Sequence, residues 1–439
     1  MSNKVVEQKE KVAVITLGCE KNTVDSEVIS GMLDKRGVRL ESDAEHADTV
    51  IINTCGFIDV AKKESIDAIL QAIELKRQGA IKKVYVAGCL SERYYSDLKD
   101  ELPEVDRFFG TQDFDSILKA VIPGSEEDRR LNLLGERLVS TPRHFSYLKI
   151  SEGCDHPCSF CAIPIMRGGH RSRSIEELEF EAMMLAGSGA KELVLIAQDS
   201  TNYGLDLYGE RTLATLLERL ARIQGIEWIR VMYAYPAKFP LDMLEVMARE
   251  EKIVNYLDIP VQHASTEVLK SMRRGITRRA TEELIHTIRA RVPGIALRTT
   301  LITGYPAEGE REFEELERFV QEMQFDRLGV FTYSQEEGTT ADPLGDPVSH
   351  EEKLRRQARL YDIQSEISLE KNQALIGTEQ RILVERREEG MYYGRLSTQA
   401  PEVDGEVVIA TSGSSSLTIG EFVMARITAA TEHDLEAVV

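Results

Sequence analysis

The sequence predicts a multidomain α/β protein with a doubly wound parallel α/β domain at the N-terminus, a central partial (βα)6 barrel and a small C-terminal antiparallel β-barrel. Three observations lead to this prediction. The length of 439 residues exceeds a single core at about 150 residues per domain. Short apolar runs alternate with amphipathic stretches of helical period up to about residue 335. After residue 372 the pattern changes to short alternating strands. We place the domains at 10–125, 140–371 and 372–439.

Composition places the chain among soluble, folded proteins. Hydrophobic residues make up 42% and charged residues 29%, typical of globular domains. Met1–Lys11 lacks the apolar run of a signal peptide, and no stretch approaches the ~18 apolar residues of a membrane span. We therefore expect a cytoplasmic protein without membrane association. The net charge of −20 repels a nucleic-acid backbone and disfavours nonspecific RNA binding.

In the N-terminal domain, three cysteines each follow a predicted strand. Cys19, Cys55 and Cys89 follow the strands expected at 12–17, 50–54 and 84–87, and the helices expected after them cover 26–36, 60–76 and 91–100. The carboxyl ends of parallel strands share one crevice, where the three thiols can converge on one cluster. The alternative is that they are small buried residues at strand ends.

The central domain reads as a parallel series of βα units. Its strands are expected at 146–150, 193–197, 229–233, 256–259, 296–303 and 328–333. Its helices are expected at 175–186, 213–223, 241–249, 281–291 and 310–323. Six such units predict a partial barrel whose chemistry lies at the carboxyl ends of the strands.

A compact cysteine motif follows the first of these strands. Cys154, Cys158 and Cys161 have the spacing Cys-x3-Cys-x2-Cys, and a reducing compartment favours metal ligation over disulfides. A closed zinc site needs a fourth ligand, for which His156 is the candidate. An iron-sulfur cluster with one open iron fits three ligands better.

This loop resembles that of the radical S-adenosylmethionine (SAM) enzymes, which carry an aromatic residue before the third cysteine, here Phe160. The resemblance implies a 4Fe-4S cluster on Cys154, Cys158 and Cys161 whose open iron binds SAM. It implies that SAM contacts come from strand ends, and the candidates are Gln198, Gln262 and Gly304. The alternative for each polar residue is that it caps a helix or satisfies loop backbone.

The segments around the first three cysteines extend the resemblance to essentially the whole chain. Residues 17–22, 24–27, 53–57 and 87–90 read LGCEKN, VDSE, NTCGF and AGCL, and they resemble the N-terminal domain of methylthiotransferases. In that family three cysteines bind an auxiliary 4Fe-4S cluster. The resemblance therefore assigns a second cluster to Cys19, Cys55 and Cys89, with the chemistry carried by clusters and SAM and with no side chain acting as acid or base.

The C-terminal region resembles the OB-like TRAM domain. Strands are expected at 382–385, 391–395, 406–410 and 422–427, after a helix near 351–372. TRAM domains of relatives grip tRNA, but residues 372–439 contain five arginines, no lysine and eleven acidic residues, for a net charge of −6. A surface that grips RNA needs cations, so this barrel suits a basic protein partner. The alternative is that its acidity only maintains solubility.

Two branches of the family differ in substrate: tRNA adenosine, or an aspartate of ribosomal protein S-twelve. Glu20 and Lys21 replace the glutamine and methionine of the tRNA branch, and residues 162–168 (AIPIMRG) and 233–236 (YAYP) also resemble the ribosomal branch. That branch implies β-methylthioaspartate as product. It also implies ribosomal protein S-twelve within the small subunit, an electron donor and a sulfur source as partners, with tRNA unlikely. The alternatives are a tRNA adenosine methylthiotransferase and a non-enzymatic metal-binding RNA factor.

Overall fold

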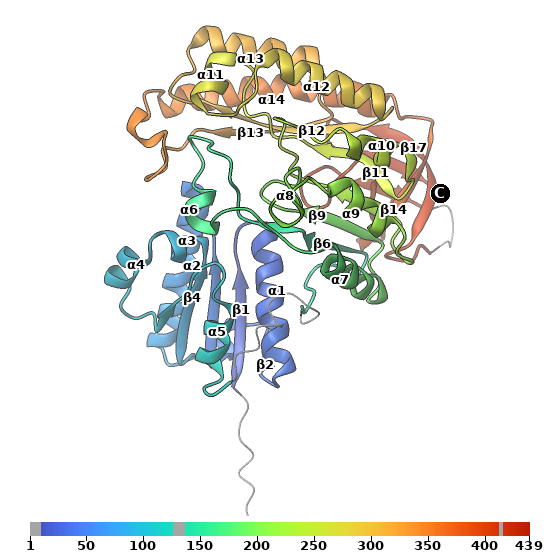
Figure 1. The fold of residues 1–439 in the computed structure, drawn as a ribbon. Coiled ribbons are helices and arrows are strands. Elements are labelled where there is room, and N and C mark those ends of the chain that lie inside the picture. Colours follow the sequence, from blue (N-terminus) through green and yellow to red (C-terminus); the bar gives the residue numbers. More distant parts are fainter. Residues whose placement is uncertain (1–9, 126–136, 412–415) are drawn as a thin grey trace, which may run out of the picture. The chain divides into compact units, whose positions relative to one another are not determined.

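The computed structural model describes residues 10–125, 137–411 and 416–439. The chain forms two compact units, each described by itself (Figure 1). The first contains the residues up to Ser140 together with Glu152–Cys154 and Ala162–Gly169, and the second contains the remainder. Residues 1–9, on which the expectation of no signal peptide rests, lie outside the described residues. No described helix is long and apolar enough to cross a membrane.

The first unit contains a five-stranded parallel sheet in the order β2-β1-β3-β4-β5. The strands are β1 (Lys11–Thr16), β2 (Arg39–Leu40), β3 (Thr49–Thr54), β4 (Lys83–Gly88) and β5 (Arg107–Phe108). This order is one of the two common doubly wound arrangements, so the predicted fold is confirmed. The outer strands β2 and β5 were not predicted, because two residues carry no readable alternation.

Helices cover both faces of this sheet. The helices of this unit are α1 (Glu20–Lys35), η1 (Ala44–His46), α2 (Asp59–Arg77), α3 (Cys89–Arg93), α4 (Tyr95–Glu101), α5 (Phe114–Val121) and α6 (Ile163–Arg167). Apolar residues of α1 and α5 share one core with the sheet, and those of α2, α3 and α4 share the other. The helix expected at 26–36 begins directly after Cys19, and the one expected at 91–100 is interrupted at Tyr94 (φ −120°, ψ 33°).

The second unit contains a six-stranded sheet whose order, β13-β12-β11-β10-β9-β6, follows the sequence, as expected of an open (βα)6 barrel. Its strands are β6 (Phe145–Lys149), β9 (Glu192–Ile196), β10 (Trp228–Val231), β11 (Ile253–Asp258), β12 (Ala296–Thr303) and β13 (Arg327–Thr332). The short strands β7 (Ser151–Glu152) and β8 (Arg171–Ser172) pair separately. The helices are α7 (Ile175–Gly187), α8 (Leu205–Tyr208), α9 (Leu213–Ala221), α10 (Asp242–Arg249), α11 (Thr266–Ser271), α12 (Arg278–Arg291), α13 (Glu310–Met323), η2 (Asp342–Leu344) and α14 (His350–Gln373).

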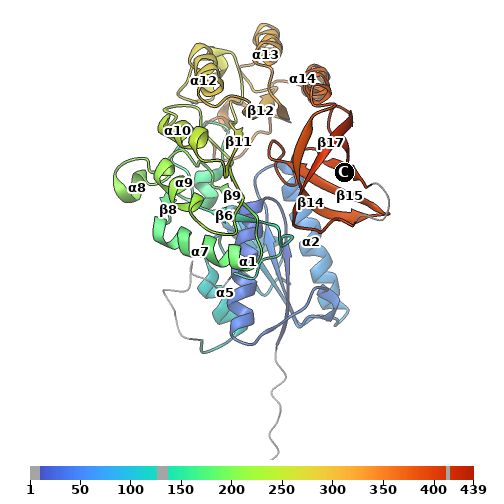
Figure 2. The same cartoon turned by 90° about the vertical axis from the view of Figure 1, so that its right-hand side faces the viewer.

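The C-terminal residues of this unit form the predicted small barrel, which is closed in the order β14-β15-β16-β18-β17 (Figure 2). Its strands are β14 (Glu379–Glu388), β15 (Met391–Leu396), β16 (Val407–Ala410), β17 (Phe422–Ala430) and β18 (Leu435–Val438). We expected four antiparallel strands, and the structure adds β18. Because β18 pairs parallel with β16 and antiparallel with β17, the barrel is not wholly antiparallel.

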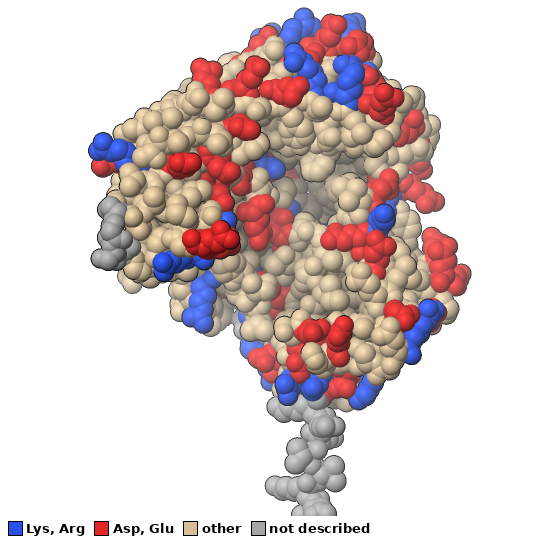
Figure 3. Space-filling model, turned by 180° about the vertical axis from the view of Figure 1, so that it is seen from behind, with Lys and Arg blue, Asp and Glu red and all other residues tan. Residues whose placement is uncertain are grey.

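Buried charges join the small barrel to the parallel sheet within the second unit. Glu192 of β9 accepts from Arg230 of β10 at 2.7 Å and from Arg395 of β15 at 2.6 Å, and Glu192 and Arg230 are fully buried. Trp228 packs edge-on against Phe422 of β17 with ring centroids 4.8 Å apart. Elsewhere, acidic side chains are spread widely over the face in Figure 3, in keeping with the net charge of −20.

Candidate functional site

In the first unit, the three predicted cysteine ligands lie at the carboxyl edge of the sheet. Cys19 caps α1 after β1, Cys55 directly follows β3, and Cys89 begins α3 after β4. Since β1, β3 and β4 are neighbours, these loops are adjacent. β1 and β3 also flank the point where strand order reverses, which is where such sheets bind ligands.

Two glycines allow the cysteine loops to approach one another. Gly18 has φ +91°, and a Cβ atom there would lie 2.6 Å from Cys55 Cβ. A Cβ atom on Gly56 would lie 2.8 Å from the backbone of Leu90, the residue after Cys89. A side chain at either position would therefore push two cysteine-bearing loops apart. Close packing of the loops therefore explains why a glycine stands beside Cys19 and beside Cys55 in the sequence.

The environment of these thiols bears on the group they can hold. Burial raises the pKa of Cys55, and it raises the pKa of Cys89 to about 12 despite the charge of Arg167. Buried thiols of this kind become good ligands when metal charge compensates the thiolates. Among the described residues, no three His, Cys, Asp or Glu side chains are close enough to hold a single metal ion. Three soft donors on separate loops fit a larger iron-sulfur cluster better.

A buried arginine that the sequence analysis did not single out contacts this cysteine group. Arg167, the last residue of α6, donates from Nε to Cys89 Sγ at 3.3 Å and also hydrogen-bonds Asn22. Its Nη1 atom lies 3.0 Å from Asp25 and from Glu152. Asn22 in turn donates to the backbone of Leu17 and Thr54, at the ends of β1 and β3. No local sequence pattern could have predicted that Arg167 contacts the cysteine group, because Cys89, Asp25 and Glu152 lie far from it in the sequence.

In the second unit, the loop that carries Cys158 and Cys161 is pinned by its backbone. Ser159 donates from its amide to the carbonyl of Met272 at 3.0 Å, and its carbonyl accepts from the amide of Ala341 at 2.7 Å. Its hydroxyl lies 2.9 Å from Tyr305 Oη. Cys154, by contrast, belongs by its contacts to the first unit, where its amide donates to Gly168 at 3.1 Å.

Two side chains from strand-end loops contact Cys158. Arg274 donates from Nη1 to Cys158 Sγ at 3.4 Å, and Tyr235 Oη lies 3.8 Å from the same sulfur. Tyr235 also donates to the carbonyl of Arg274 at 2.7 Å. Cys158 is therefore held between a guanidinium and a phenol from two strand-end loops.

His156, the candidate fourth zinc ligand, is already engaged. Its Nε2 atom lies 2.6 Å from Asp199 Oδ2, and its ring stacks on Tyr235 with centroids 3.6 Å apart. Burial opposes ionisation of Asp199, but its hydrogen bonds with His156 and Thr201 outweigh burial and lower its pKa. His156 therefore acts in this structure as a brace for the loop.

The four predicted SAM contacts lie on or near the carboxyl side of the second sheet. Phe160 packs against the apolar cluster that includes Ile302 and Tyr305. Gln198 lies two residues beyond β9, and Gln262 (φ 73°) bridges its backbone to Leu301 of β12. Gly304 follows β12 and donates its amide to Glu308 at 2.7 Å. The Gly304 amide thus has a partner within the loop, which agrees with the alternative that polar groups at the strand ends satisfy the loop backbone.

Comparison with known proteins identifies the family. The chain is 53% identical over 428 residues to the ribosomal protein uS12 methylthiotransferase RimO of Flavobacterium psychrophilum, covering 98% of each chain. It is 54% identical over 430 residues to the RimO of Chloroherpeton thalassium, again covering 98% of each. The chain belongs to the RimO family. The family profiles that match are Uncharacterized protein family UPF0004 at 11–110, the Radical SAM superfamily at 148–320 and the TRAM domain at 376–439.

Solved structures support the fold. The radical S-adenosylmethionine methyltransferase TsrM from Kitasatospora setae, with cobalamin and a 4Fe-4S cluster bound, superposes with a TM-score of 0.57 at 14% identity, covering 76% of this chain and 77% of TsrM. The cobalamin-dependent radical enzyme OxsB gives 0.52 at 15% identity, covering 81% of this chain and 56% of OxsB. At these identities the likeness concerns the fold, so the architecture around the cysteine motif is that of radical SAM enzymes.

Proposed function

We propose that this protein is a radical SAM methylthiotransferase that inserts a methylthio group at the β-carbon of an aspartate in ribosomal protein uS12. The observation that carries the proposal is the similarity to RimO relatives over 98% of the chain. The acidic small barrel, with a net charge of −6, agrees with a basic protein substrate. The same charge disfavours a tRNA substrate and a role as an RNA-binding factor.

We assign one 4Fe-4S cluster to Cys154, Cys158 and Cys161 and an auxiliary one to Cys19, Cys55 and Cys89. The motif spacing supports the first assignment, and the adjacent loops after β1, β3 and β4 support the second. When bound, the clusters and SAM supply radical hydrogen abstraction and sulfur at a carbon too inert for acid-base chemistry.

The protein's own side chains hold and orient these groups. Arg274 and Tyr235 fix Cys158, and His156 braces the loop between the cysteines through Asp199. Phe160, Gln198, Gln262 and Gly304 are the SAM contacts that we propose. Their shared position near the strand ends is where barrels of this class bind ligands.

The small ribosomal subunit, an electron donor and a sulfur source are the partners that this chemistry requires. We infer a cytoplasmic location, because ribosomal protein uS12 is the substrate.

The test uses anaerobically purified protein with iron and sulfide analysis, SAM, dithionite and isolated small subunits. We expect two clusters per chain, 5′-deoxyadenosine release, and a methylthio mass increase on the uS12 peptide. Cys154→Ala should abolish SAM cleavage, whereas Cys89→Ala should retain cleavage and lose sulfur insertion. Methylthiolated product from Cys89→Ala would contradict the auxiliary cluster. A modified tRNA nucleoside with an unmodified uS12 peptide would contradict the substrate.

A further inference from the structure

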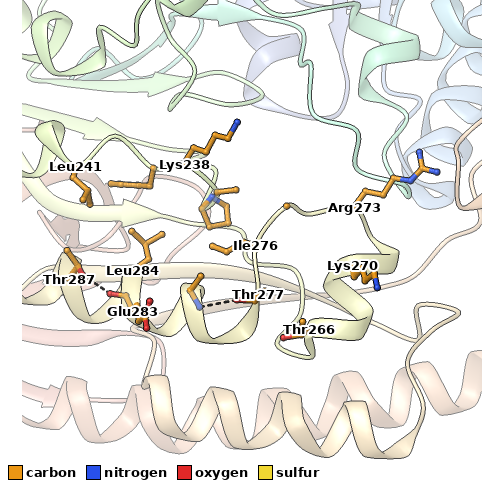
Figure 4. Close-up of a pocket in the computed structure, with 15 residues that line it drawn as sticks. Lys238, Leu241, Thr266, Lys270, Arg273, Ile276, Thr277, Glu283, Leu284 and Thr287 are labelled. Atoms are coloured by element: carbon orange, nitrogen blue, oxygen red, sulfur yellow. Dashed lines mark hydrogen bonds between the residues drawn. The ribbon is translucent and has the colours of Figure 1, made fainter.

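A cavity of about 800 Å³ lies beside the carboxyl side of the second sheet. Its walls come from the loop after β10, from α11 and the turn after it, and from α12 (Figure 4). The lining includes the apolar residues Leu241, Ile276 and Leu284. No residue of this cavity takes part in the proposed chemistry.

Three exposed cations line this cavity. Lys238, Lys270 and Arg273 form no ion pair or side-chain hydrogen bond with any described residue. Glu283 also lines the cavity, but it is neutralised by Arg279 at 2.7 Å. In a chain of net charge −20, three cations left without partners point to an anionic surface that approaches from outside.

The backbone that presents two of these cations is constrained. Lys238 has φ 56° and Arg273 has φ 55°, in the left-handed region that side chains other than glycine avoid. Such conformations persist where the surrounding structure enforces them, often at ligand-binding positions. The backbone at both positions is therefore held in a fixed conformation by its surroundings, which sets where the two side chains leave the chain.

The wall of the cavity is continuous with the residues that contact Cys158. Pro236 and Gly275 line the cavity, and they directly follow Tyr235 and Arg274, whose side chains lie 3.8 Å and 3.4 Å from Cys158 Sγ. Arg273 precedes Arg274, and Lys238 lies three residues after Tyr235, at most roughly 11 Å along the chain. An anionic partner on this surface is thus close to the proposed cluster ligand Cys158.

We propose that the Lys238, Lys270 and Arg273 surface docks an acidic one-electron carrier protein that reduces the cluster on Cys154, Cys158 and Cys161. The inference rests on the proposed function. The carrier is oxidised by one electron, the cluster accepts that electron, and no bond or proton moves. Complexes of redox proteins bury little area and are steered by charge, so a small group of cations suffices. Binding to ribosomal RNA requires many neutralised phosphates, which three cations in an acidic chain do not supply.

The test titrates the holoenzyme with an acidic plant-type ferredoxin by calorimetry and measures SAM cleavage driven by reduced ferredoxin or by dithionite. In Lys238→Glu/Arg273→Glu we expect at least tenfold weaker ferredoxin binding and at least tenfold slower ferredoxin-driven cleavage. Dithionite-driven cleavage should stay within twofold, which also shows that the variant folds. Wild-type binding should weaken as ionic strength rises from about 0.05 M to about 0.2 M.

The matched control is Arg222→Glu/Arg318→Glu, which reverses two exposed cations outside the cavity lining and should bind ferredoxin like wild type. The inference would be overturned if the Lys238→Glu/Arg273→Glu protein bound ferredoxin and accepted its electron as well as the wild-type protein does. Weakened binding to small ribosomal subunits with unchanged ferredoxin binding would also overturn it, in favour of an RNA contact. Absence of dithionite-driven cleavage in wild type would count against the proposed function instead, and the ferredoxin isotherm would still decide the docking surface.

Discussion

Arg167 Nε donates a hydrogen bond to Cys89 Sγ at 3.3 Å, while Nη1 of the same guanidinium lies 3.0 Å from Asp25 and from Glu152. The arginine side chain is 4% exposed, as is Asp25. One buried cation therefore serves a thiol and two carboxylates in the first unit. Arginine suits this position because its planar guanidinium offers five donors in a fixed geometry.

Replacing this arginine should destabilise the fold. Arg167→Ala leaves the buried carboxylate of Asp25 without its cation, and we expect the free energy of unfolding to fall by about 3–5 kcal/mol. Urea denaturation of the full chain measures this loss. Asp25→Asn in the same chain should recover part of it, and Arg167→Lys should cost less than Arg167→Ala. Equal free energies of unfolding for the wild type and Arg167→Ala would show that the Arg167 contacts do not stabilise the fold.

The Arg395–Glu192 pair should stabilise the attachment of the small barrel to the parallel sheet. Both side chains are at most 3% exposed, so Arg395→Ala should lower the free energy of unfolding by about 3–5 kcal/mol. The matched control is Arg381→Ala, which removes a pair between the same two parts with Glu227, both about 45% exposed. Exposed pairs contribute about 1 kcal/mol or less. Comparable losses in the two variants would contradict the importance of burial.

Acid should weaken the same attachment through Glu385. Burial opposes its ionisation, but the hydrogen bond with His144 and the charge of Arg395 outweigh burial and lower its pKa from 4.5 to about 2. The ionised form therefore stabilises the fold above pH 4.5, and this contribution, roughly 3 kcal/mol, is lost as pH falls from 4.5 towards 2. Denaturation curves across this range should show a shallower pH dependence for Glu385→Gln than for wild type. Parallel curves would exclude the assignment.

Gly304 should tolerate no side chain. Its φ is +75°, and a Cβ atom would lie 2.3 Å from Cγ of the buried Lys353, whose ammonium donates to the carbonyl of Tyr333 at 2.8 Å. We expect Gly304→Ala to lower the free energy of unfolding by about 1–3 kcal/mol. Thermal melts measure the loss. Gly390→Ala is the control for φ alone, because its φ is +88° and its Cβ would meet nothing within 4 Å. An equal loss in both variants would show that the clash with Lys353 adds nothing.

Local sequence patterns predicted most helices and strands, but not the start of α1 or the short strand β18. The strand from residue 296 to 303 and the helix from 310 to 323 have the predicted bounds, because their hydrophobic periods are long enough to read. α1 begins before its predicted start because Asn22 and Asp25, poor helix formers in isolation, bind partners outside the helix. β18 was missed because it has only four residues, Leu435–Val438, too few for their alternation to be read beside β17.

By itself, the sequence determined the alternation of βα units, the grouping of six cysteines into one loop motif and three strand ends, and the acidity of the small barrel. These features depend on residue spacing and composition, which can be read from residues close together in the sequence. Only the tertiary structure decided that Arg167 contacts Cys89 and that Arg274 and Tyr235 contact Cys158. It also decided that Lys238, Lys270 and Arg273 line one cavity and form no ion pair with any residue that the structure describes. Such partnerships join residues far apart in the chain, so they depend on strand order and burial and leave no periodic mark in the sequence.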